Sequence, residues 1–318
     1  MNLTSQLGLG TAALGRPQYI NVRQEDLQDK DLEAFKQRGF KVLEEAYKLG
    51  IRYFDTAPGY GLAENLVLEW LQSKNDETIQ VATKWGYTYV ANFDAKAKIH
   101  EVKEHSLLKL NEQWETSKSL LPHLKVYQIH SATLETGVLE NKPVLDRLAF
   151  LKDEYNLKIG VTTTGADQVE VIKKALDVSV SGKPLFDAYQ VTYNILEQSL
   201  LDILERLNRE GRSIIIKEAL ANGRIFRNKS YPHYNKLYDL LASLALKYNV
   251  GVDAISLCFC SETIQGSTVL GGASIESHIV SNLKMNTFRL SKVELEELKG
   301  YNMDARSYWQ ERKQLTWN

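Results

Sequence analysis

Four polar side chains stand at or just after the ends of three successive apolar runs of the sequence. Asp55 and Tyr60 lie in RYFDTAPGYG, Lys84 in QVATKWG and His130 in VYQIHSA. A tyrosine phenol has a pKa of about 10, and an adjacent ammonium stabilises the tyrosinate and lowers that pKa. Lys84 can supply this charge, and Asp55 can hold the lysine charged and oriented. His130 can donate a hydrogen bond to the oxygen that Tyr60 would protonate, so the set can polarise a carbonyl group and convert it to an alcohol.

These residues need a scaffold that brings the ends of successive strands together. Short apolar runs alternate with longer segments of helical periodicity, which indicates βαβ units and a parallel sheet. The expected strands number about eight, which is enough to close a barrel; they are residues 7–13, 52–57, 79–85, 125–131, 158–163, 187–194, 213–219 and 267–273. The sequence therefore predicts an α/β fold, a (β/α)8 TIM barrel, with its site at the C-terminal ends of the strands.

Amphipathic segments separate the strands. The expected helices are residues 34–49, 63–72, 102–114, 143–155, 166–177, 200–209, 237–248 and 274–284. Ser291 and Glu294 have the spacing of a capping box, which predicts a further helix and then a tail that contains Tyr308, Trp309 and Trp317. Since no linker or low-complexity tract interrupts the pattern, we expect a single domain over residues 1–318.

Two polar segments are longer than a bare barrel requires. They are residues 18–31, before the first helix, and residues 221–235, after the seventh strand. Long loops at the C-terminal face of a barrel usually shape or cover a site. We therefore expect both segments to lie near the four polar residues.

The overall composition points to a small-molecule partner. The formal net charge is -1 over 318 residues, so nothing favours a nucleic-acid or membrane partner. The first residues lack the pattern of a secretory signal, which predicts a cytoplasmic protein. Cys258 and Cys260 are expected to be reduced core thiols, and two cysteines alone are too few ligands for a structural metal site, so we expect no metal. A monomer or weak oligomer is expected.

At this point the motifs resemble those of a known family. The chain resembles the aldo-keto reductases from LGLGTAALG through GIRYFDTAPGYG, VATKWG, YQIHSA, KIGVTTTG, DAYQVTYN and KEALANGRI to VLGGAS, over nearly its whole length. The resemblance implies that Tyr60 is the general acid and base, that Lys84 and Asp55 lower its pKa, and that His130 orients the substrate. NADPH or NADH would supply the hydride for a small aldehyde, ketone or sugar. The dinucleotide fingerprint GxGxxG of the Rossmann fold is absent.

The resemblance also implies where the cofactor binds. The expected contacts lie along the rim of the barrel, at Gly10, Thr11, Asp55, Thr162, Thr163, Gln190, Lys217, Leu220, Asn222, Gly272, Ala273, Ser274, His278 and Asn282. Two positions depart from the family pattern. Thr162 and Thr163 stand where a Ser-Asn pair usually holds the nicotinamide amide, and Lys217 stands where an aromatic residue often stacks on the ring. Lys217 either reaches a phosphate or a substrate carboxylate, or forms an ion pair with Glu218.

The choice between the two dinucleotides depends on the segment GGASIESHIVSNL. Members that prefer NADP commonly hold its 2′-phosphate with an arginine or lysine here, because a guanidinium can pair with phosphate through two hydrogen bonds. This chain has Ser274, Ser277 and His278 instead, and its next basic residue is Lys284. The free amides of a helix start at Ser274 can still bind a phosphate. The resemblance favours NADP(H), with NAD(H) as the alternative.

Aromatic residues are expected to wall the substrate pocket. Trp85 follows Lys84 directly and is predicted to contact substrate together with Tyr60 and His130, and loop 86–95 and segment 18–31 can add to the wall. Trp309 and Trp317 either join this wall or pack against the outside of the barrel. Two other functions stay open: a barrel that binds cofactor but acts as a regulatory or scaffold subunit, and an enzyme of the oxidation direction, such as a sugar or pyridoxal dehydrogenase.

Overall fold

Eight parallel strands close into a barrel in the computed structural model, which describes residues 6–16, 32–94 and 97–315. Around the barrel the strands are β1 (Gln6–Gly10), β2 (Tyr53–Asp55), β3 (Gln80–Trp85), β6 (Leu124–Ala132), β7 (Lys158–Thr163), β10 (Ala188–Thr192), β11 (Ser213–Lys217) and β12 (Thr268–Gly271). Pairing of Gln6 with Thr268 closes the circle. Each strand overlaps one of the predicted segments, so the predicted fold class is confirmed. Strands buried on both faces read as continuous apolar runs, which is why the sequence revealed them.

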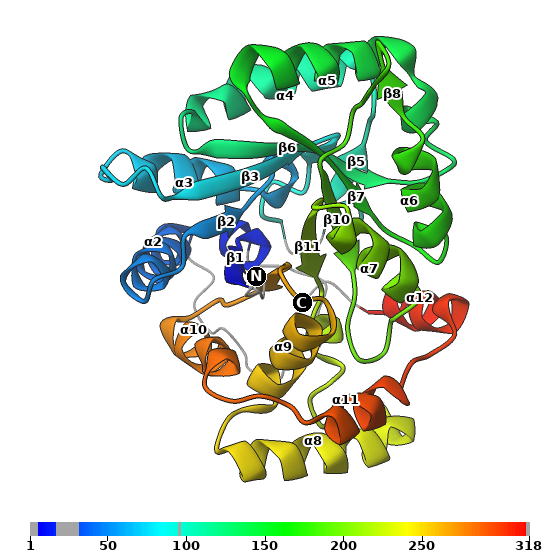
Figure 1. Cartoon of the computed structure of the whole chain (residues 1–318). Coiled ribbons are helices and arrows are strands. Elements are labelled where there is room, and N and C mark those ends of the chain that lie inside the picture. Colours follow the sequence, from blue (N-terminus) through cyan, green and yellow to red (C-terminus); the bar gives the residue numbers. More distant parts are fainter. Residues whose placement is uncertain (1–5, 17–31, 95–96, 316–318) are drawn as a thin grey trace.

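Helices form a ring around these strands (Figure 1). They are α1 (Ala12–Gly15), α2 (Leu32–Lys48), α3 (Ala63–Leu71), α4 (Leu107–Ser117), α5 (Lys142–Tyr155), α6 (Gln168–Leu176), α7 (Leu201–Arg209), α8 (Asn235–Tyr248), α9 (Val252–Thr263), α10 (Glu276–Leu283), α11 (Lys292–Lys299) and α12 (Ala305–Lys313). In α2 the buried side chains include Phe35, Val42 and Leu43, which recur at helical spacing and face the barrel. The capping box at Ser291 and Glu294 is present at the start of α11. The single domain over residues 1–318 stays a prediction.

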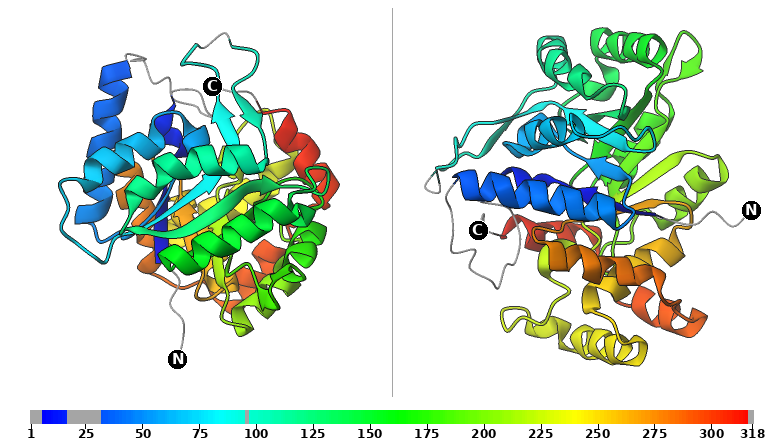
Figure 2. Two further views of the ribbon diagram at one scale, coloured as in Figure 1. Left: turned by 90° about the horizontal axis from the view of Figure 1, so that it is seen from above. Right: turned by 90° about the vertical axis from the view of Figure 1, so that its left-hand side faces the viewer.

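The structure corrects the start of one predicted helix. Residues 102–106 do not belong to the helix expected at 102–114, because Val102 lies in β5 (Glu101–Lys103), which pairs antiparallel with β4 (Tyr87–Tyr89). Helix α4 begins only after Ser106, whose side chain accepts a hydrogen bond from the amide of Lys109 (3.1 Å). A second small hairpin is formed by β8 (Ser179–Val180) and β9 (Lys183–Pro184). Figure 2 shows β4 and β5 (cyan) at the same end of the barrel as α12 (red).

Helix α9 was not predicted. It carries Cys258 and Cys260, which are buried and unbonded to each other, as expected of reduced core thiols. Burial raises the pKa of the Cys258 thiol to about 12. Helix α8 packs on the outer side of α9, and eight of the twelve residues of α9 are buried (Figure 1). The sequence of α9 therefore shows little of the periodicity that marks an amphipathic helix.

The inside of the barrel is filled by a small apolar layer. Six strands each contribute one buried residue to it: Tyr53, Ala82, Val126, Ala188, Ile215 and Leu270. The larger core lies between the strands and the helices. Because neighbouring side chains of a strand point to opposite faces, the residues two positions after this inner layer also point into the barrel.

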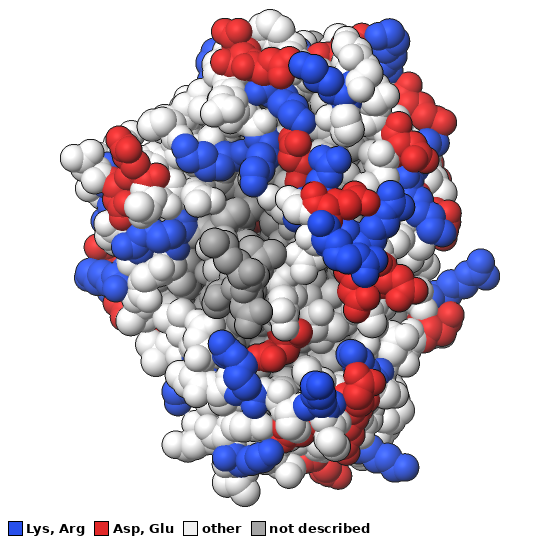
Figure 3. Space-filling model, in the orientation of Figure 1, with Lys and Arg blue, Asp and Glu red and all other residues white. Residues whose placement is uncertain are grey.

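The described surface mixes both signs of charge. On the face seen in Figure 3, lysine and arginine side chains are interspersed with aspartate and glutamate. Among the residues that the structure describes, no single helix is long and apolar enough to cross a membrane. The bent pair Pro232–Tyr248 and Val252–Thr263 meets that test only when its two helices are counted together.

Candidate active site

A polar layer lies above the apolar layer, toward the C-terminal ends of the strands. It consists of Asp55, Lys84, Gln128, Gln190 and Lys217, each two residues beyond a member of the apolar layer. The alternation of side chains along a strand therefore turns all five into the barrel. Strand pairing sets Lys84 beside Gln128 and Thr192 beside Lys217. Sequence reasoning found four of the five and missed Gln128.

The carboxylate of Asp55 is the centre of this layer. One of its oxygens forms an ion pair with the ammonium of Lys84, and the other accepts hydrogen bonds from Gln190 Nε2 (2.7 Å) and Gln128 Nε2 (3.5 Å). Lys84 Nζ also donates to the carbonyl of Thr56 (3.0 Å). Both charged groups are almost fully buried, at 2% exposure for Asp55 and 1% for Lys84. A buried ion pair persists when its remaining donors and acceptors are satisfied, and the two glutamines satisfy Asp55.

Tyr60 and His130 meet at the mouth of the barrel. Tyr60 ends the 3-10 turn Pro58–Tyr60 that follows β2, and its hydroxyl lies 3.5 Å from Nε2 of His130. The two rings stand edge to face, with centroids 5.3 Å apart. Burial, with the charges of Lys84 and Lys217, lowers the pKa of His130 well below its usual value, so the imidazole is neutral at pH 7. A neutral imidazole has one N–H to donate.

The pKa of Tyr60 differs from the sequence expectation. Burial raises it well above its usual value, and the Asp55 carboxylate raises it further, while Arg16 lowers it. Lys84 Nζ does lie 4.8 Å from the centre of the Tyr60 ring, but its charge is already paired with Asp55. In this state the phenol holds its proton, which is the form that can donate to a carbonyl oxygen.

Arg16 is a site residue that the sequence did not reveal. It follows α1, is 3% exposed, and donates to the carbonyl of Gly59 (3.2 Å) and to Glu101 Oε2 (3.0 Å). Its guanidinium lies 5.7 Å from the centre of the Tyr60 ring. Gly15, the residue before Arg16, packs so closely against the backbone of Tyr60 that an added Cβ would lie 1.8 Å from the carbonyl oxygen of Tyr60. These contacts hold the turn that presents Tyr60, and they join segments too far apart in sequence to form a local motif.

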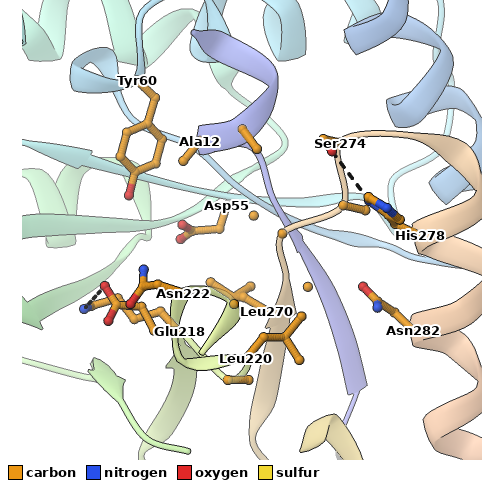
Figure 4. Close-up of a pocket in the computed structure, with 18 of the residues that line it drawn as sticks. Ala12, Asp55, Tyr60, Glu218, Leu220, Asn222, Leu270, Ser274, His278 and Asn282 are labelled. Atoms are coloured by element: carbon orange, nitrogen blue, oxygen red, sulfur yellow. Dashed lines mark hydrogen bonds and ion pairs between the residues drawn. The ribbon is translucent and has the colours of Figure 1, made fainter. Parts of the chain in front are cut away.

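A cavity of about 690 Å³ runs along the rim from these residues. Figure 4 shows Tyr60 and Asp55 at one end and Ser274, His278 and Asn282 at the other. The predicted residues that line it are Gly10, Asp55, Tyr60, His130, Thr162, Gln190, Lys217, Leu220, Asn222, Gly272, Ala273, Ser274, His278 and Asn282. Asn222, Gly223 and Phe226 come from segment 221–235, as expected, whereas segment 18–31 lies outside the described residues.

Four predicted site residues lie behind the wall of the cavity. Lys84 stands behind Asp55, and Thr11 donates through its hydroxyl to the carbonyl of Asp55 (3.0 Å), so both position the carboxylate from behind. The hydroxyl of Thr163 turns to Gln168 Oε1 (3.3 Å). Trp85 is fully buried, with its ring 5.5 Å from that of His105.

Trp85 is therefore not the aromatic wall that was predicted. It follows Lys84 directly, and since Lys84 points into the barrel, Trp85 points outward. Tyr87 lines the cavity instead, with its ring 4.6 Å from that of His130. Trp309 is 3% exposed and packs beside Tyr308 as part of the core, while Trp317 lies outside the described residues.

The far end of the cavity holds an acidic side chain that the sequence analysis missed. Asp253, in the first turn of α9, accepts hydrogen bonds from Ser281 Oγ (2.9 Å) and Asn282 Nδ2 (2.7 Å). His278 Nδ1 lies 3.5 Å from Ser274 Oγ at the start of α10. Of the described residues that line the cavity, the lysines and arginines are Arg16, Lys217 and Arg312.

The end near Tyr60 carries a second group of charges, from β11 and α12. Arg312 pairs with both carboxylate oxygens of Glu218, through Nε at 3.0 and 2.9 Å and through Nη2. Lys217 Nζ donates to Thr192 Oγ1 (2.7 Å) and lies 3.9 Å from Glu218. Burial would raise the pKa of Glu218, but Arg312 and Lys217 outweigh it and hold that pKa at about 2. In the described part of the chain, no group of three or more His, Cys, Asp or Glu side chains could hold a metal ion.

Comparison with known proteins identifies the family. The model of the Aldo/keto reductase family matches residues 6–302. The chain belongs to this family. Norsolorinic acid reductase B of Dothistroma septosporum is 26% identical over 298 residues, which cover 86% of this chain and 74% of that protein. NADH-specific methylglyoxal reductase of Escherichia coli is 24% identical over 318 residues, which cover 90% of this chain and 91% of that protein.

Solved structures agree in fold with this aldo/keto reductase. The glycerol dehydrogenase of Gluconobacter oxydans superposes with a TM-score of 0.70 at 20% identity, covering 94% of this chain and 91% of that one. The holo form of an aldo-keto reductase from Bacillus halodurans gives 0.69 at 20% identity, covering 95% and 93%. The family match makes the chain an NAD(P)-dependent oxidoreductase of small carbonyl compounds.

Proposed function

We propose that this aldo/keto reductase interconverts the carbonyl and alcohol forms of a small aldehyde, ketone or sugar, with Tyr60 as the general acid and base. One observation carries the proposal: the hydroxyl of Tyr60 and Nε2 of His130 lie 3.5 Å apart, facing one cavity. A carbonyl oxygen bound beside both atoms would accept a hydrogen bond from each. Such polarisation favours attack at the carbonyl carbon.

The cavity fits a nicotinamide dinucleotide. The cavity is elongated, and Gly10 and Gly272 form part of its wall. A Cβ added at Gly272 would point into open space. A flat ring can approach the backbone closely at such a position. We propose that Thr162 and Gln190 hold the nicotinamide end, and that Ser274 and Asn282 hold the adenosine end. When bound, the dinucleotide supplies the hydride.

The chain's own residues handle the proton. Tyr60 gives its phenolic proton to the oxygen that becomes the alcohol, and the charge of Arg16, whose Cζ lies 5.7 Å from the ring centre, stabilises the tyrosinate that remains. Lys84 Nζ lies 4.8 Å from the same ring centre. Asp55 keeps the lysine in place through their ion pair. In the oxidation direction Tyr60 takes the same proton back, so the residues permit either direction.

The substitution Tyr60→Phe tests this proposal. It keeps the ring and removes the proton donor, so we expect the turnover number to fall by about 10²–10⁴-fold, the usual contribution of general acid catalysis. Turnover is followed by the absorbance of the reduced cofactor against a panel of aldehydes, ketones and sugars. Tyr155→Phe is the matched control, because Tyr155 packs against Trp114 on the outer side of the barrel.

Two outcomes would contradict the proposal. If Tyr60→Phe keeps most of the wild-type turnover, Tyr60 is not the proton donor. If the wild type binds the dinucleotide but turns over no carbonyl or alcohol substrate, the regulatory or scaffold function is favoured. Fluorescence titration of the cofactor in both variants separates a loss of chemistry from a loss of binding.

We propose further that NAD(H) is the preferred cofactor, in contrast to the preference that the sequence resemblance favoured. At the end of the cavity near Ser274, the described lining residues include the carboxyl group of Asp253 and no lysine or arginine. Glu276 adds a negative charge in the first turn of α10. A 2′-phosphate placed here would meet negative charge instead of a cation, whereas a 2′-hydroxyl would meet none of this repulsion.

A further inference from the structure

Lys217 is a charged residue of the cavity that the mechanism does not use. It ends β11 and belongs to the same polar layer as Asp55 and Lys84. One of its three N–H bonds points to a neutral acceptor, the hydroxyl of Thr192 (2.7 Å). The nearest carboxylate, Glu218, is 3.9 Å away, beyond hydrogen-bond distance.

Lys217 and Glu218 form the ion pair that the sequence allowed, but it is long, at 3.9 Å, because Glu218 already has a closer partner. Its two oxygens are both engaged by Arg312, at 3.0 and 2.9 Å from Nε. A carboxylate bound through two hydrogen bonds to a guanidinium has its charge largely satisfied. Burial lowers the pKa of Lys217 to about 8, against the opposing effect of Glu218, as expected of an ammonium without a close counter-charge.

Among the described residues at this end of the cavity, one cation has no close carboxylate partner. Three ion pairs account for most of the charges here: Asp55 with Lys84, Glu101 with Arg16, and Glu218 with Arg312. Among the described side chains that line the cavity, the lysines and arginines are Arg16, Arg312 and Lys217, and of these only Lys217 lacks a carboxylate within hydrogen-bond distance. The cavity at this end therefore has room and charge for one anionic group.

We propose that Lys217 binds the carboxylate of the substrate, so that the enzyme prefers aldehydes or ketones that carry a carboxylate. This inference rests on the proposed function. Lys217 and His130 line the same cavity, so the ammonium and the proposed carbonyl site face one space. Figure 4 shows Glu218, the residue after Lys217, on the wall across from Tyr60. Since Lys217 also lines this cavity, a substrate whose carbonyl lies at Tyr60 can extend its carboxylate toward Lys217. A phosphate of the cofactor is the other anion that Lys217 could bind.

The test compares carboxylated aldehydes with their methyl esters. Glyoxylate, succinic semialdehyde and 4-carboxybenzaldehyde place the carboxylate at increasing distances from the carbonyl, and each ester removes the charge while keeping the carbonyl. One of these acids should fit the distance between Tyr60 and Lys217 best. For that acid, we expect the wild type to have a higher kcat/KM than it has for the methyl ester of the same acid. Lys217→Met keeps the length of the side chain and removes its charge. We expect it to lower the acid-to-ester ratio by about tenfold or more, mainly through the KM of the acid.

Two control variants test whether the acid-to-ester ratio of kcat/KM depends on the charge of Lys217. Lys217→Arg keeps the positive charge and should restore much of the preference. Lys142→Met removes an exposed lysine that pairs with Asp146 on α5, and should leave the ratio unchanged. If Lys217→Met changes acid and ester equally, or weakens NADH binding by the same factor, Lys217 serves the cofactor and the proposal is wrong.

A binding measurement separates this inference from the proposed function. Calorimetric titration of benzoate and succinate into the protein saturated with NADH requires no turnover. We expect at least one of the two carboxylates to bind the wild type and to bind Lys217→Met about tenfold more weakly. Equal binding by both proteins, or binding by neither, would overturn the carboxylate site even if Tyr60→Phe confirms the catalytic role of Tyr60.

Discussion

Glu64 shows how burial changes the behaviour of a single residue close to the site. It lies on α3, 4% exposed, and accepts hydrogen bonds from the hydroxyls of Thr83 and Ser117 (2.8 Å for the second). Burial raises the pKa of Glu64 to about 7, although both hydrogen bonds and the charge of Lys84 lower it. Burial thus makes this carboxyl group much easier to protonate than that of an exposed glutamate.

This pKa predicts a pH-dependent stability. A carboxyl group whose pKa is raised by folding stabilises the protein below its unfolded pKa of 4.5, and that stability is lost as the pH rises through 7. The shift corresponds to about 3 kcal/mol. We expect Glu64→Gln to remove the pH dependence of stability that Glu64 causes. In urea titrations, the difference in unfolding free energy between this variant and the wild type should therefore change between pH 5 and pH 8. Glu69→Gln, an exposed position on α3, is the control, and parallel pH profiles of Glu64→Gln and wild type would refute the assignment.

The sequence predicted the part of the site that strands provide and missed much of the part that loops provide. Asp55 and Lys84 were predicted because they stand at the ends of apolar runs, and Gln190 because of the resemblance to the family. Strand alternation explains why all three point into the barrel. The same rule, applied to the next residue, would have excluded Trp85 from the cavity. Arg16 and Asp253 could not be predicted, because their partners are distant in sequence and no local pattern marks them.

Helix α11 is fixed to the barrel's outer layer by one carboxylate. Glu294 accepts from the amide of Ser291, from Lys247 Nζ and from the hydroxyl of Tyr248, each at 2.7 Å. Burial would raise the pKa of Glu294, but these hydrogen bonds outweigh it and hold that pKa at about 2. One side chain therefore caps α11 and joins it to α8.

This cap predicts sensitivity to acid. A carboxyl group whose pKa is lowered by folding stabilises the protein above its unfolded pKa of 4.5, and that stability is lost as the pH falls toward 2. We expect Glu294→Gln to destabilise the protein at pH 7 by about 1–2 kcal/mol, in the range of a lost cap and its hydrogen bonds. The difference from wild type should shrink between pH 4.5 and pH 3 in denaturant titrations. Glu297→Gln, on the same helix, serves as the control; a difference that is independent of pH would contradict this role.

Helices that bury one side and short strands that are buried on both faces were predicted correctly from the sequence. The stripe of α2 and the short apolar strands were found for that reason. Helix α9 was missed because it is buried on nearly all sides, and residues 102–106 were misassigned because a two-stranded hairpin of three-residue strands has too few residues to show a period.

At the scale of the whole molecule, residues of β1, α9, β12 and α10 line the cavity, so a dinucleotide bound there as proposed would join distant segments. A ligand that binds only the folded protein raises its melting temperature in proportion to the logarithm of its concentration over its Kd. Because Asp253 and Glu276 lie near the end of the cavity proposed to hold the adenosine, we expect NADH to raise the Tm more than NADPH at equal concentration. Ser274→Arg should reverse this order by adding a partner for the 2′-phosphate.

Differential scanning fluorimetry with both cofactors measures this preference. Ser119→Arg, at an exposed position away from the cavity, controls for the added charge. A larger shift with NADPH in the wild type would contradict the preference for NAD(H), while leaving the proton-transfer residues unaffected.

The pairing of β1 with β12 also bears on how the chain folds during synthesis. Gln6 and Thr268 are partners across this seam, through the backbone register and a side-chain hydrogen bond of 3.0 Å. On the ribosome, β1 emerges early and has no partner on this edge until β12 has been made, so the growing sheet keeps an open edge throughout that time. Open edges invite pairing with other chains. The barrel can therefore close only after β12 has been made, and until then the unpaired edge of β1 exposes the nascent chain to aggregation.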